Sequence, residues 1–395
     1  MSDGSGEWRE DGDGDADTDA CWDRLGRDLT ALILSKLPLR SMLRATAVCK
    51  AWRAALRASP SLKQGRPWLF LHGRSNAGVP RIGRNAVAYD PDEPSSWVSF
   101  TLPTDCVAGA GGFAFTAPSL SHLAFAPLLR DGAWRHAPPL ASSRCNPVIA
   151  AVPSGPSSER RHLFLVIGGG GFPGGLVDIE DRLPTELYEY DRRGDGAAAG
   201  GEWEQAAPLP EELRTGSSSS LSLSSALVGD RFFFVCGIYS CTVSAFDLAR
   251  RAWTAPHNLC PVPGLVAAFV ATGHRGRRLV LAGVEEGRCA LGVWDVEPRT
   301  LAASKIGEMP ADLAAGVLPG SVRCVGQDGL LYVLSEEEHR GYPACVCEVI
   351  DDDGDEMACR WSRLPPLPAP AGRSRFRRMV AFCSPVLLRN HLHTD

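Results

Sequence analysis

The sequence predicts a small all-α module followed by a large all-β domain that is assembled from a repeated unit. Apolar residues recur at helical spacing only between residues 25 and 60. Beyond Trp68, short β-type runs alternate with Gly, Pro, Asp and Ser at intervals of about ten residues, and they return in the same order several times. A chain of 395 residues, of which 44% are hydrophobic and 22% charged, has room for one small and one large folded domain.

Composition narrows the classes of function and the compartment. The net charge of −5 gives no electrostatic reason to expect nucleic acid as a partner. The chain has no apolar run of about eighteen residues, so no membrane span is expected. The 13 cysteines are odd in number and scattered singly, unlike a secreted disulfide framework, which favours the cytoplasm or the nucleus. Residues 1–20 are acidic and Gly-rich, so they are expected to form a disordered tail and not a signal peptide.

Three short helices are predicted between residues 25 and 60. Asp28 and Ser41 are the expected N-caps of the first two, and Pro38 and Pro60 are the expected stops. So short a segment cannot bury its apolar surface alone, and it therefore needs either the rest of this chain or another protein as a partner. The apolar residues at helical spacing are Leu29, Leu32 and Ile33 in the first helix, Met42 and Leu43 in the second, and Val48, Trp52 and Leu56 in the third.

Three segments of this module, LILSKLPL at 32–39, VCKAWR at 48–53 and SP at 59–60, resemble an F-box in order and spacing. The F-box is the module by which substrate receptors dock on the Skp-type adaptor of Skp–cullin–F-box ubiquitin ligases. One departure is that Gly26 follows Leu25 where the family usually has proline, which leaves the start of the first helix less rigid. A helical cap packed permanently on the neighbouring domain is the alternative. The resemblance implies that ten residues contact the adaptor or support that contact: Leu25, Leu29, Ile33, Leu34, Leu37, Pro38, Leu43, Val48, Cys49 and Trp52.

The clearest copy of the β-type repeat runs from 222 to 263 and contains four strand-like runs. Further copies are expected at 146–210, 264–310 and 320–368, and two poorer copies precede them, of which the second is expected to lack one strand. Run-final glycines suit tight turns or close backbone approach. The residues with expected structural roles are Asp90, Asp191 and Asp247, which can form Asx-type turns, and Trp97, Trp134, Trp203, Trp253 and Trp361, which can wedge between neighbouring sheets.

This repeat resembles the kelch family of β-propellers, in which four-stranded blades surround a channel. We count six blades, with five or seven left open. The first unit begins at its second strand, and RRMVAFCSP at 377–385 has the pattern of a first strand without a blade of its own. The expected fold is therefore a small all-α F-box module followed by an all-β kelch-type propeller of six blades, closed by the C-terminal strand. The expected boundaries are a disordered tail at 1–20, the F-box module at 21–60, a linker at 61–66, the propeller at 67–388 and a tail at 389–395.

Motifs for enzymatic chemistry are incomplete. GGGGFPGG at 168–175 lacks the Gly-Lys-Ser/Thr ending of a phosphate-binding loop, and no helix pattern follows it. A zinc site at Cys345, Cys347, Cys359 and His339 lacks a second CxxC-like pair, so buried strand cysteines are favoured. A copper oxidase of the galactose-oxidase type needs clustered Tyr and His residues, and the six tyrosines and nine histidines of this chain form no recognisable cluster. No G-x-S-x-G elbow supports a hydrolase. We therefore expect no catalytic residue, no metal and no cofactor.

The two modules together suggest a non-catalytic substrate receptor of a ubiquitin ligase. Its expected partners are the Skp-type adaptor, a cullin that binds through the adaptor, and a protein substrate. Neither nucleic acid nor a membrane is expected as a partner. The resemblance is strongest to plant F-box/kelch receptors, some of which act on phenylpropanoid or flavonoid enzymes. Among the loops, 172–185 and 192–201 exceed what hairpins need, whereas the basic run at 373–378 is either a solvated loop or a patch for an acidic substrate. The alternatives are a non-ligase kelch scaffold and a propeller oxidase. The expected substrate contacts are Phe172, Leu176, Val177 and Ile179.

Overall fold

The chain forms two compact units, one comprising Met1–Gly65 with Leu388–Asp395 and the other Arg66–Leu387. We refer to the helices of the first as the helical unit and to the second as the propeller unit. The structure, a computed structural model of the whole chain, describes the following residues: 26–58, 65–74, 85–95, 97–103, 106–130, 134–154, 161–170, 182–191, 201–214, 221–287, 289–336, 343–351, 357–368, 378–388 and 391.

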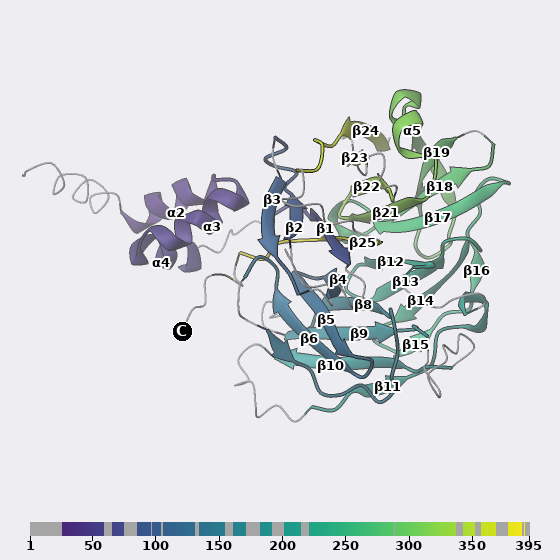
Figure 1. Cartoon of the computed structure of the whole chain (residues 1–395), viewed down its shortest axis with the longest axis horizontal. Coiled ribbons are helices and arrows are strands. Elements are labelled where there is room, and N and C mark those ends of the chain that lie inside the picture. Colours follow the sequence, from purple (N-terminus) through teal and green to yellow (C-terminus); the bar gives the residue numbers. More distant parts are fainter. Residues whose placement is uncertain are drawn as a thin grey trace, which may run out of the picture. The chain divides into compact units, whose positions relative to one another are not determined.

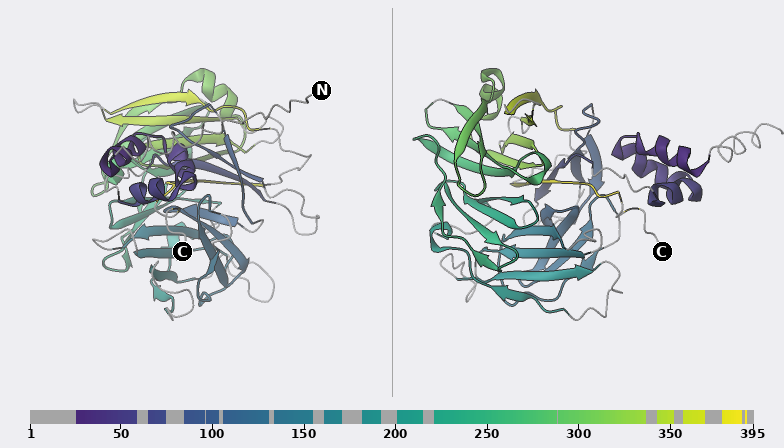
Figure 2. Two further views of the ribbon diagram at one scale, coloured as in Figure 1. Left: turned by 90° about the vertical axis from the view of Figure 1, so that its left-hand side faces the viewer. Right: turned by 180° about the vertical axis from the view of Figure 1, so that it is seen from behind.

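The helical unit contains three short helices, α2 (Arg27–Ser35), α3 (Leu39–Val48) and α4 (Lys50–Ala58), which Figure 2 shows as one cluster. Helix α4 packs against both of the others. The Arg53 Nε–H donates to the carbonyl oxygen of Thr46 at 2.8 Å and fastens α4 to the end of α3. The small core consists of apolar side chains that are at most 8% exposed, namely Leu34, Leu39, Met42, Ala45, Ala55 and Leu56.

The predicted helix starts differ from the observed ones. Gly26 is the N-cap of α2, and Asp28 lies inside the first turn, where its carboxylate still suits the positive end of the helix dipole. Ser41 likewise lies inside α3, because Pro38, with φ −58°, already directs the chain into that helix. Val48 ends α3 and does not begin α4, since extended backbone at the next residue separates the two helices. The existence of three helices was predictable from apolar spacing, but their first residues were not.

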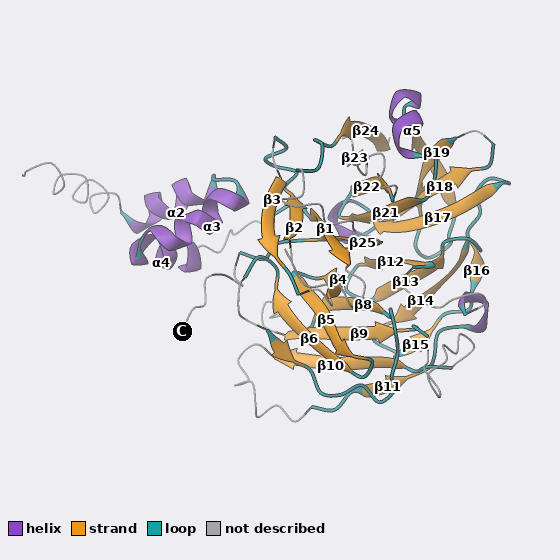
Figure 3. Ribbon diagram, in the orientation of Figure 1, coloured by secondary structure: helices purple, strands orange, loops and turns teal. Residues whose placement is uncertain are grey.

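The propeller unit consists of six antiparallel sheets that follow one another in chain order (Figures 1 and 3). Each sheet is one blade of four strands that follow one another in the chain, except that the last strand of the chain belongs to blade 1 and a fifth strand joins blade 4. Blade 1 contains β25 (Arg378–Ser384), β1 (Trp68–Arg74), β2 (Asn85–Tyr89) and β3 (Trp97–Thr101). Blade 2 contains β4 (Cys106–Ala110), β5 (Phe113–Ser119), β6 (His122–Pro127) and β7 (Arg135–His136). Blade 3 contains β8 (Val148–Pro153), β9 (Arg161–Ile167), β10 (Thr185–Asp191) and β11 (Glu204–Ala206).

The second half of the propeller has the same plan with two additions. Blade 4 contains β12 (Leu223–Val228), β13 (Phe232–Gly237), β14 (Thr242–Asp247) and β15 (Ala252–Trp253), and β16 (His257–Asn258) also pairs with β14. Blade 5 contains β17 (Leu265–Thr272), β18 (Leu279–Glu285), β19 (Ala290–Val296) and β20 (Ala303–Glu308). Blade 6 contains β21 (Val322–Gln327), β22 (Leu330–Ser335), β23 (Ala344–Asp351) and β24 (Met357–Arg363). The second addition is α5 (Ala311–Val317), between blades 5 and 6.

The C-terminal strand closes the ring, as the sequence predicts. Strand β25 pairs with β1 in continuous register from Trp68 opposite Ser384 to Arg74 opposite Arg378. The ring of Phe382 stacks on that of Phe70 at 5.0 Å. The first strand of each blade contacts the first strand of the next, and β21 contacts β25, so the circuit is complete. These six first strands line a central cavity of about 190 Å³. The prediction of short N-terminal helices followed by an all-β propeller of six blades, closed by the C-terminal strand, is therefore confirmed.

Blade 2 is complete, and the expectation that it lacks a strand is wrong. Its first strand, β4, has the sequence CVAGA, in which small residues hide the usual strand pattern. The reason is close packing beside the closing strand, since a Cβ atom on Gly109 would overlap the ring of Phe382. The small residues that allow β4 to pack so closely are not the β-branched or aromatic residues by which strands are usually predicted.

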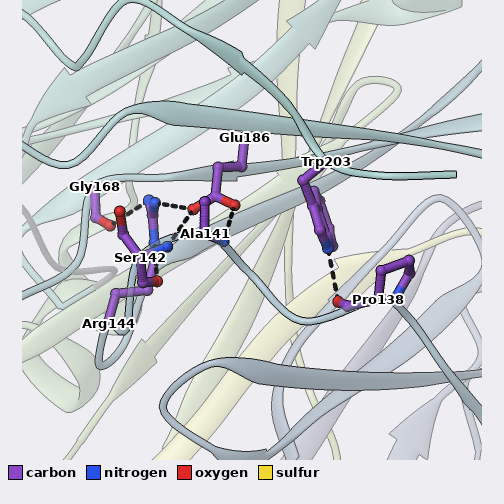
Figure 4. A network of polar contacts seen from close by, with 7 residues as sticks. All are labelled: Pro138, Ala141, Ser142, Arg144, Gly168, Glu186 and Trp203. Atoms are coloured by element: carbon purple, nitrogen blue, oxygen red, sulfur yellow. Dashed lines mark hydrogen bonds and ion pairs between the residues drawn. The ribbon is translucent and has the colours of Figure 1, made fainter.

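Three of the predicted tryptophan wedges fasten a blade to the preceding one. The indole N–H of Trp203 donates to the carbonyl of Pro138 at 2.7 Å, as Figure 4 shows. Trp97 donates to Pro365 at 3.1 Å, and Trp253 donates to Ala207 at 3.1 Å. Trp361 packs beside α5 in the core between blades 5 and 6, and among the described residues its indole N–H has no acceptor.

A buried ion pair joins blades 2 and 3 (Figure 4). The side chains of Arg144 and Glu186 are both fully buried and lie 2.5 Å apart. The Glu186 carboxylate also accepts hydrogen bonds from the backbone N–H groups of Ala141, at 2.7 Å, and Ser142, at 3.3 Å. Arg144 donates in addition to the carbonyl of Gly168 at 3.1 Å. The charges are thus paired and hydrogen-bonded, as buried charges must be.

Candidate adaptor-binding surface

Helix α2 presents an apolar face that the helical unit itself does not cover. Leu29, Leu32 and Ile33 are 53%, 54% and 43% exposed. Their spacing of i, i+3 and i+4 places them on one side of the helix, whereas Leu34 points into the core and is 2% exposed. Three large apolar side chains exposed on one helix face do not stabilise a monomer, so this face is suited to binding a partner.

A second exposed group lies where α3 meets α4. Val48 is 63% exposed, and Cys49 beside it is also exposed. The backbone N–H of Trp52 donates to the Cys49 sulfur at 3.4 Å, so the thiol helps to cap α4. This hydrogen bond and the one from Arg53 to Thr46 fix the junction between α3 and α4, so the backbone that carries Val48 is held in place.

Positive charge predominates in the helical segment. Between residues 26 and 58 the chain carries seven basic side chains and one acidic side chain, an excess of six positive charges. The acidic residue is Asp28, and the basic residues are Arg27, Lys36, Arg40, Arg44, Lys50, Arg53 and Arg57. A partner for this segment should therefore offer both apolar and acidic side chains.

The structure sorts the predicted adaptor residues into three groups. Leu29, Ile33, Pro38, Val48 and Cys49 are exposed, and Leu37, Leu43 and Trp52 are half-buried. Leu34 belongs to the core and can only support the surface, and Leu25 lies outside the described residues. The prediction missed Leu32, although its helical spacing from Leu29 was visible in the sequence.

The predicted substrate contacts Phe172, Leu176, Val177 and Ile179 lie outside the described residues, as do most of the loop at 192–201 and the basic run up to residue 377. The glycines at 168–170 have a structural role, because Gly170 and Cys145 exchange backbone hydrogen bonds of 2.9 and 3.1 Å. These bonds join the turn to the segment that carries Arg144.

The cysteines of blade 6 are core residues. Cys345 and Cys347 are fully buried, and burial raises the pKa of the Cys345 thiol to about 12, which disfavours the thiolate that metals require. Within the described ranges, no group of three or more His, Cys, Asp or Glu is arranged to hold a metal ion, and His339 lies outside those ranges. No helix in the described part of the chain is long and apolar enough to span a membrane.

Comparison with known proteins identifies the helical segment. The sequence matches none of the curated proteins with which it was compared. Matching solved structures include a protein of unknown function from Bacteroides caccae, at 13% identity over 81% of this chain and 98% of that chain, with a TM-score of 0.41. Another is TolB from Acinetobacter baumannii, at 12% identity over 85% of this chain and 71% of that chain, with a TM-score of 0.44. Neither likeness bears on function. Residues 22–64 match the F-box domain, so this chain carries an F-box domain ahead of its six-bladed propeller.

Proposed function

We propose that this chain is the substrate-recognition subunit of a Skp–cullin–F-box ubiquitin ligase. The helical unit docks a Skp-type adaptor, which links it to a cullin, and the kelch-type propeller holds a protein that is to be ubiquitinated and degraded. The observation that carries the proposal is the exposed apolar face of Leu29, Leu32 and Ile33, within a segment that matches the F-box domain. The propeller supplies a rigid ring of loops of the kind that proteins use for recognition.

The mechanism requires no bond-making side chain in this chain. A receptor acts by holding lysines of its substrate near the charged conjugating enzyme, which turns a bimolecular encounter into one within a complex. A residue of this chain therefore contributes to the rate through binding and placement alone. We expect no turnover of a small molecule by the isolated protein.

The energetics of docking follow from the surface. Full burial of a Leu, Ile or Val side chain is worth about 1.5–3 kcal/mol. The apolar face of α2 and Val48 can therefore provide several kcal/mol, and the cations of the same segment add attraction toward an acidic surface and raise the association rate. Raising the salt concentration should slow association more than it speeds dissociation, because salt screens the exposed charges and leaves the apolar contact intact.

The adaptor interface is tested by Ile33→Lys, with Val266→Lys in the propeller unit as the matched control. Both side chains are 43% exposed, so neither change disturbs a core. The lysine at position 33 would bring an unpaired charge into the docked interface and should weaken binding to a purified Skp-type adaptor by about 2 kcal/mol or more, roughly thirtyfold. The control should bind as the unchanged protein does, measured by titration calorimetry.

Two results would contradict the proposal. The first is undiminished adaptor binding by Ile33→Lys while circular dichroism shows intact helices. The second is the absence of adaptor binding by the unchanged full chain, which would favour the alternative of a non-ligase scaffold.

We also propose that the substrate is held in part by the loop at 172–181, which mixes Phe172, Leu176, Val177 and Ile179 with acidic residues. Its length and its apolar content support this assignment. Replacement of 172–181 by a short Gly-Ser turn should leave adaptor binding unchanged and remove the substrate from complexes purified with the proteasome inhibited. Mass spectrometry of those complexes also tests whether the substrate is a phenylpropanoid or flavonoid enzyme. Substrate retained at unchanged levels would place the site elsewhere on the ring.

A further inference from the structure

In three blades an arginine lies at or just before the start of the second strand, and each of these arginines has a structural partner. Arg231 pairs with Asp247, the last residue of the third strand of blade 4, at 2.7 Å. Arg278 pairs with Asp295 in blade 5. Arg161 lies 3.3 Å from Asp191 in blade 3. In each case the pair ties the two middle strands of one blade together at the same edge of the sheet.

Blades 4 and 5 carry further arginines at this edge that have no such role. Arg275, Arg277 and Arg299 are exposed, and in residues 221–287 and 289–336, which the structure describes around them, none has an ion pair or a side-chain hydrogen bond. The side chain of Arg250 is 79% exposed, with its nearest carboxylate oxygen, on Asp247, 3.9 Å away. Four arginines are thus displayed without contributing appreciably to the stability of the fold.

These arginines form one surface across two blades. Loops that join strands 1 and 2 and strands 3 and 4 lie at the same edge of an antiparallel blade. The backbone N–H of Gly229 in blade 4 donates to the carbonyl of Gly276 in blade 5 at 2.6 Å. Within blade 5, Arg278 lies 2.9 Å from Glu297 and so joins its two loops. We call this surface the arginine rim and define it as Arg231, Arg250, Arg275, Arg277, Arg278 and Arg299. Arg251 is left out, because it lies 3.9 Å from Glu189 and 3.7 Å from Glu204 of blade 3.

The arginine rim is positive in a chain that is negative as a whole. The same turns contain four carboxylates, Asp230, Asp247, Asp295 and Glu297, against these six arginines, which leaves an excess of two positive charges. The chain has a net charge of −5. The positive charge is therefore a local feature of blades 4 and 5 and does not follow from composition.

We infer that the arginine rim binds an acidic peptide segment of the protein that the propeller holds. This inference rests on the proposed function and adds a second contact with the substrate and its chemical class. The arginine rim lies at the edge opposite to the one where β9 ends and β10 begins, so it would hold a different segment of the substrate from the loop at 172–181. A guanidinium group presents a planar fork of N–H donors that matches a carboxylate or a phosphate with two parallel hydrogen bonds. Four exposed forks on adjoining loops fit a short run of Asp, Glu or phosphorylated side chains. The four carboxylates among the arginines disfavour nucleic acid, because its continuous phosphate backbone needs an unbroken basic surface.

The test compares two double variants of the full chain with equal changes of net charge. Arg275→Glu with Arg277→Glu reverses the centre of the arginine rim. Arg182→Glu with Arg360→Glu is the control, since both arginines are exposed, lack a described ion pair and lie on blades 3 and 6 away from the rim. The probe is a fluorescent peptide of about twelve residues rich in Asp and Glu, and binding is measured by fluorescence anisotropy.

The unchanged protein and the control should bind the peptide alike, and the rim variant should bind it about tenfold or more weakly. Binding should also weaken as salt rises, because the contacts are exposed. A serine peptide with and without phosphates distinguishes phosphorylated from plain acidic segments as the source of the negative charge. Equal losses in the two double variants, or tighter binding of single-stranded DNA than of either peptide, would overturn the inference. All variants should bind the Skp-type adaptor normally, so a failure of the inference is distinguishable from a failure of the proposed function.

Discussion

At the residue scale, Asp247 shows how one side chain serves both a turn and a blade. Its Oδ1 atom accepts backbone hydrogen bonds from Ala249 at 2.9 Å and Arg250 at 3.2 Å, which form the predicted Asx-type turn. Its other oxygen pairs with Arg231 at 2.7 Å, and the side chain is 6% exposed. The hydrogen bond from Arg231, together with those of the backbone, lowers the pKa of Asp247 to about 2.

This pKa predicts a loss of stability in acid. The unfolded carboxyl has a pKa of about 3.9, so below that pH the unfolded state takes up a proton that the folded state binds only near pH 2. The contribution of Asp247 is therefore fully present near neutral pH and is lost as the pH falls from about 4 to about 2. Asp247→Asn, which retains a turn-forming side chain, should lower the free energy of unfolding by about 1 kcal/mol at pH 7 and by less at pH 2.5.

Urea denaturation of both proteins at pH 7, 4 and 2.5 checks this prediction. Asp230→Asn is the control, because Asp230 is an exposed carboxylate next to Arg231 without a described ion pair. A difference between Asp247→Asn and the unchanged protein that stays constant with pH would show that the ion pair does not carry the effect.

At the scale of elements, the contact between blades 2 and 3 depends on the Arg144–Glu186 pair. Glu186→Gln would leave the buried guanidinium without a counter-charge, and loss of one partner of a buried pair costs about 3–5 kcal/mol. Glu189→Gln on the same strand should change stability by less than about 0.5 kcal/mol, because the side chain of Glu189 is 67% exposed and 3.9 Å from Arg251. Chemical denaturation measures both, and equal effects would contradict a special role for the buried pair.

Elements were predictable where their signal was local and periodic. The strand that contains Met379 and Phe382 was identified from its own pattern, as was the helix that carries Leu29 and Ile33. Strand β4 was not predicted, because Gly109 and its small neighbours are required by close packing against Phe382 and lack the usual strand pattern. Helix α5 was not predicted, because it is stabilised by burial of Leu313 and has no distinctive sequence. Such elements depend on contacts between distant segments, which spacing along one chain does not reveal.

Of the two candidate surfaces, one could be predicted from local sequence and the other could not. The apolar face of α2 could be predicted, because the helical spacing of its three large side chains can be read directly from the sequence. The arginine rim could not, because Arg250, Arg275 and Arg299 are far apart in the sequence and are brought to one edge only by the blade topology. The available signal in the sequence was the repeated arginine at or just before the second strand of three blades, namely Arg161, Arg231 and Arg278.

At the scale of the whole propeller, stability depends on the pairing of β25 with β1. Deletion from Met379 onward would leave the inner edge of β1 unpaired and break the contacts of β25 with β4 and β21. The shortened protein should aggregate or be cleaved readily, whereas deletion of 389–395 should leave the melting temperature unchanged, since β25 ends at Ser384. Size-exclusion chromatography, limited proteolysis and thermal melting test both. A soluble protein with an unchanged melting temperature after the longer deletion would refute closure by β25.

The pairing of Trp68 with Ser384 also imposes an order on synthesis. A ribosome adds roughly 5–20 residues per second, so about 15–60 s separate the two halves of this ladder. Through that interval the helices at residues 27–58 are already made, whereas the ring remains open. A chain that stops early would therefore have a complete adaptor-docking segment and no closed recognition domain. We expect such fragments to compete with the full-length receptor for adaptor, so that premature termination inhibits the intact protein as well as reducing its amount.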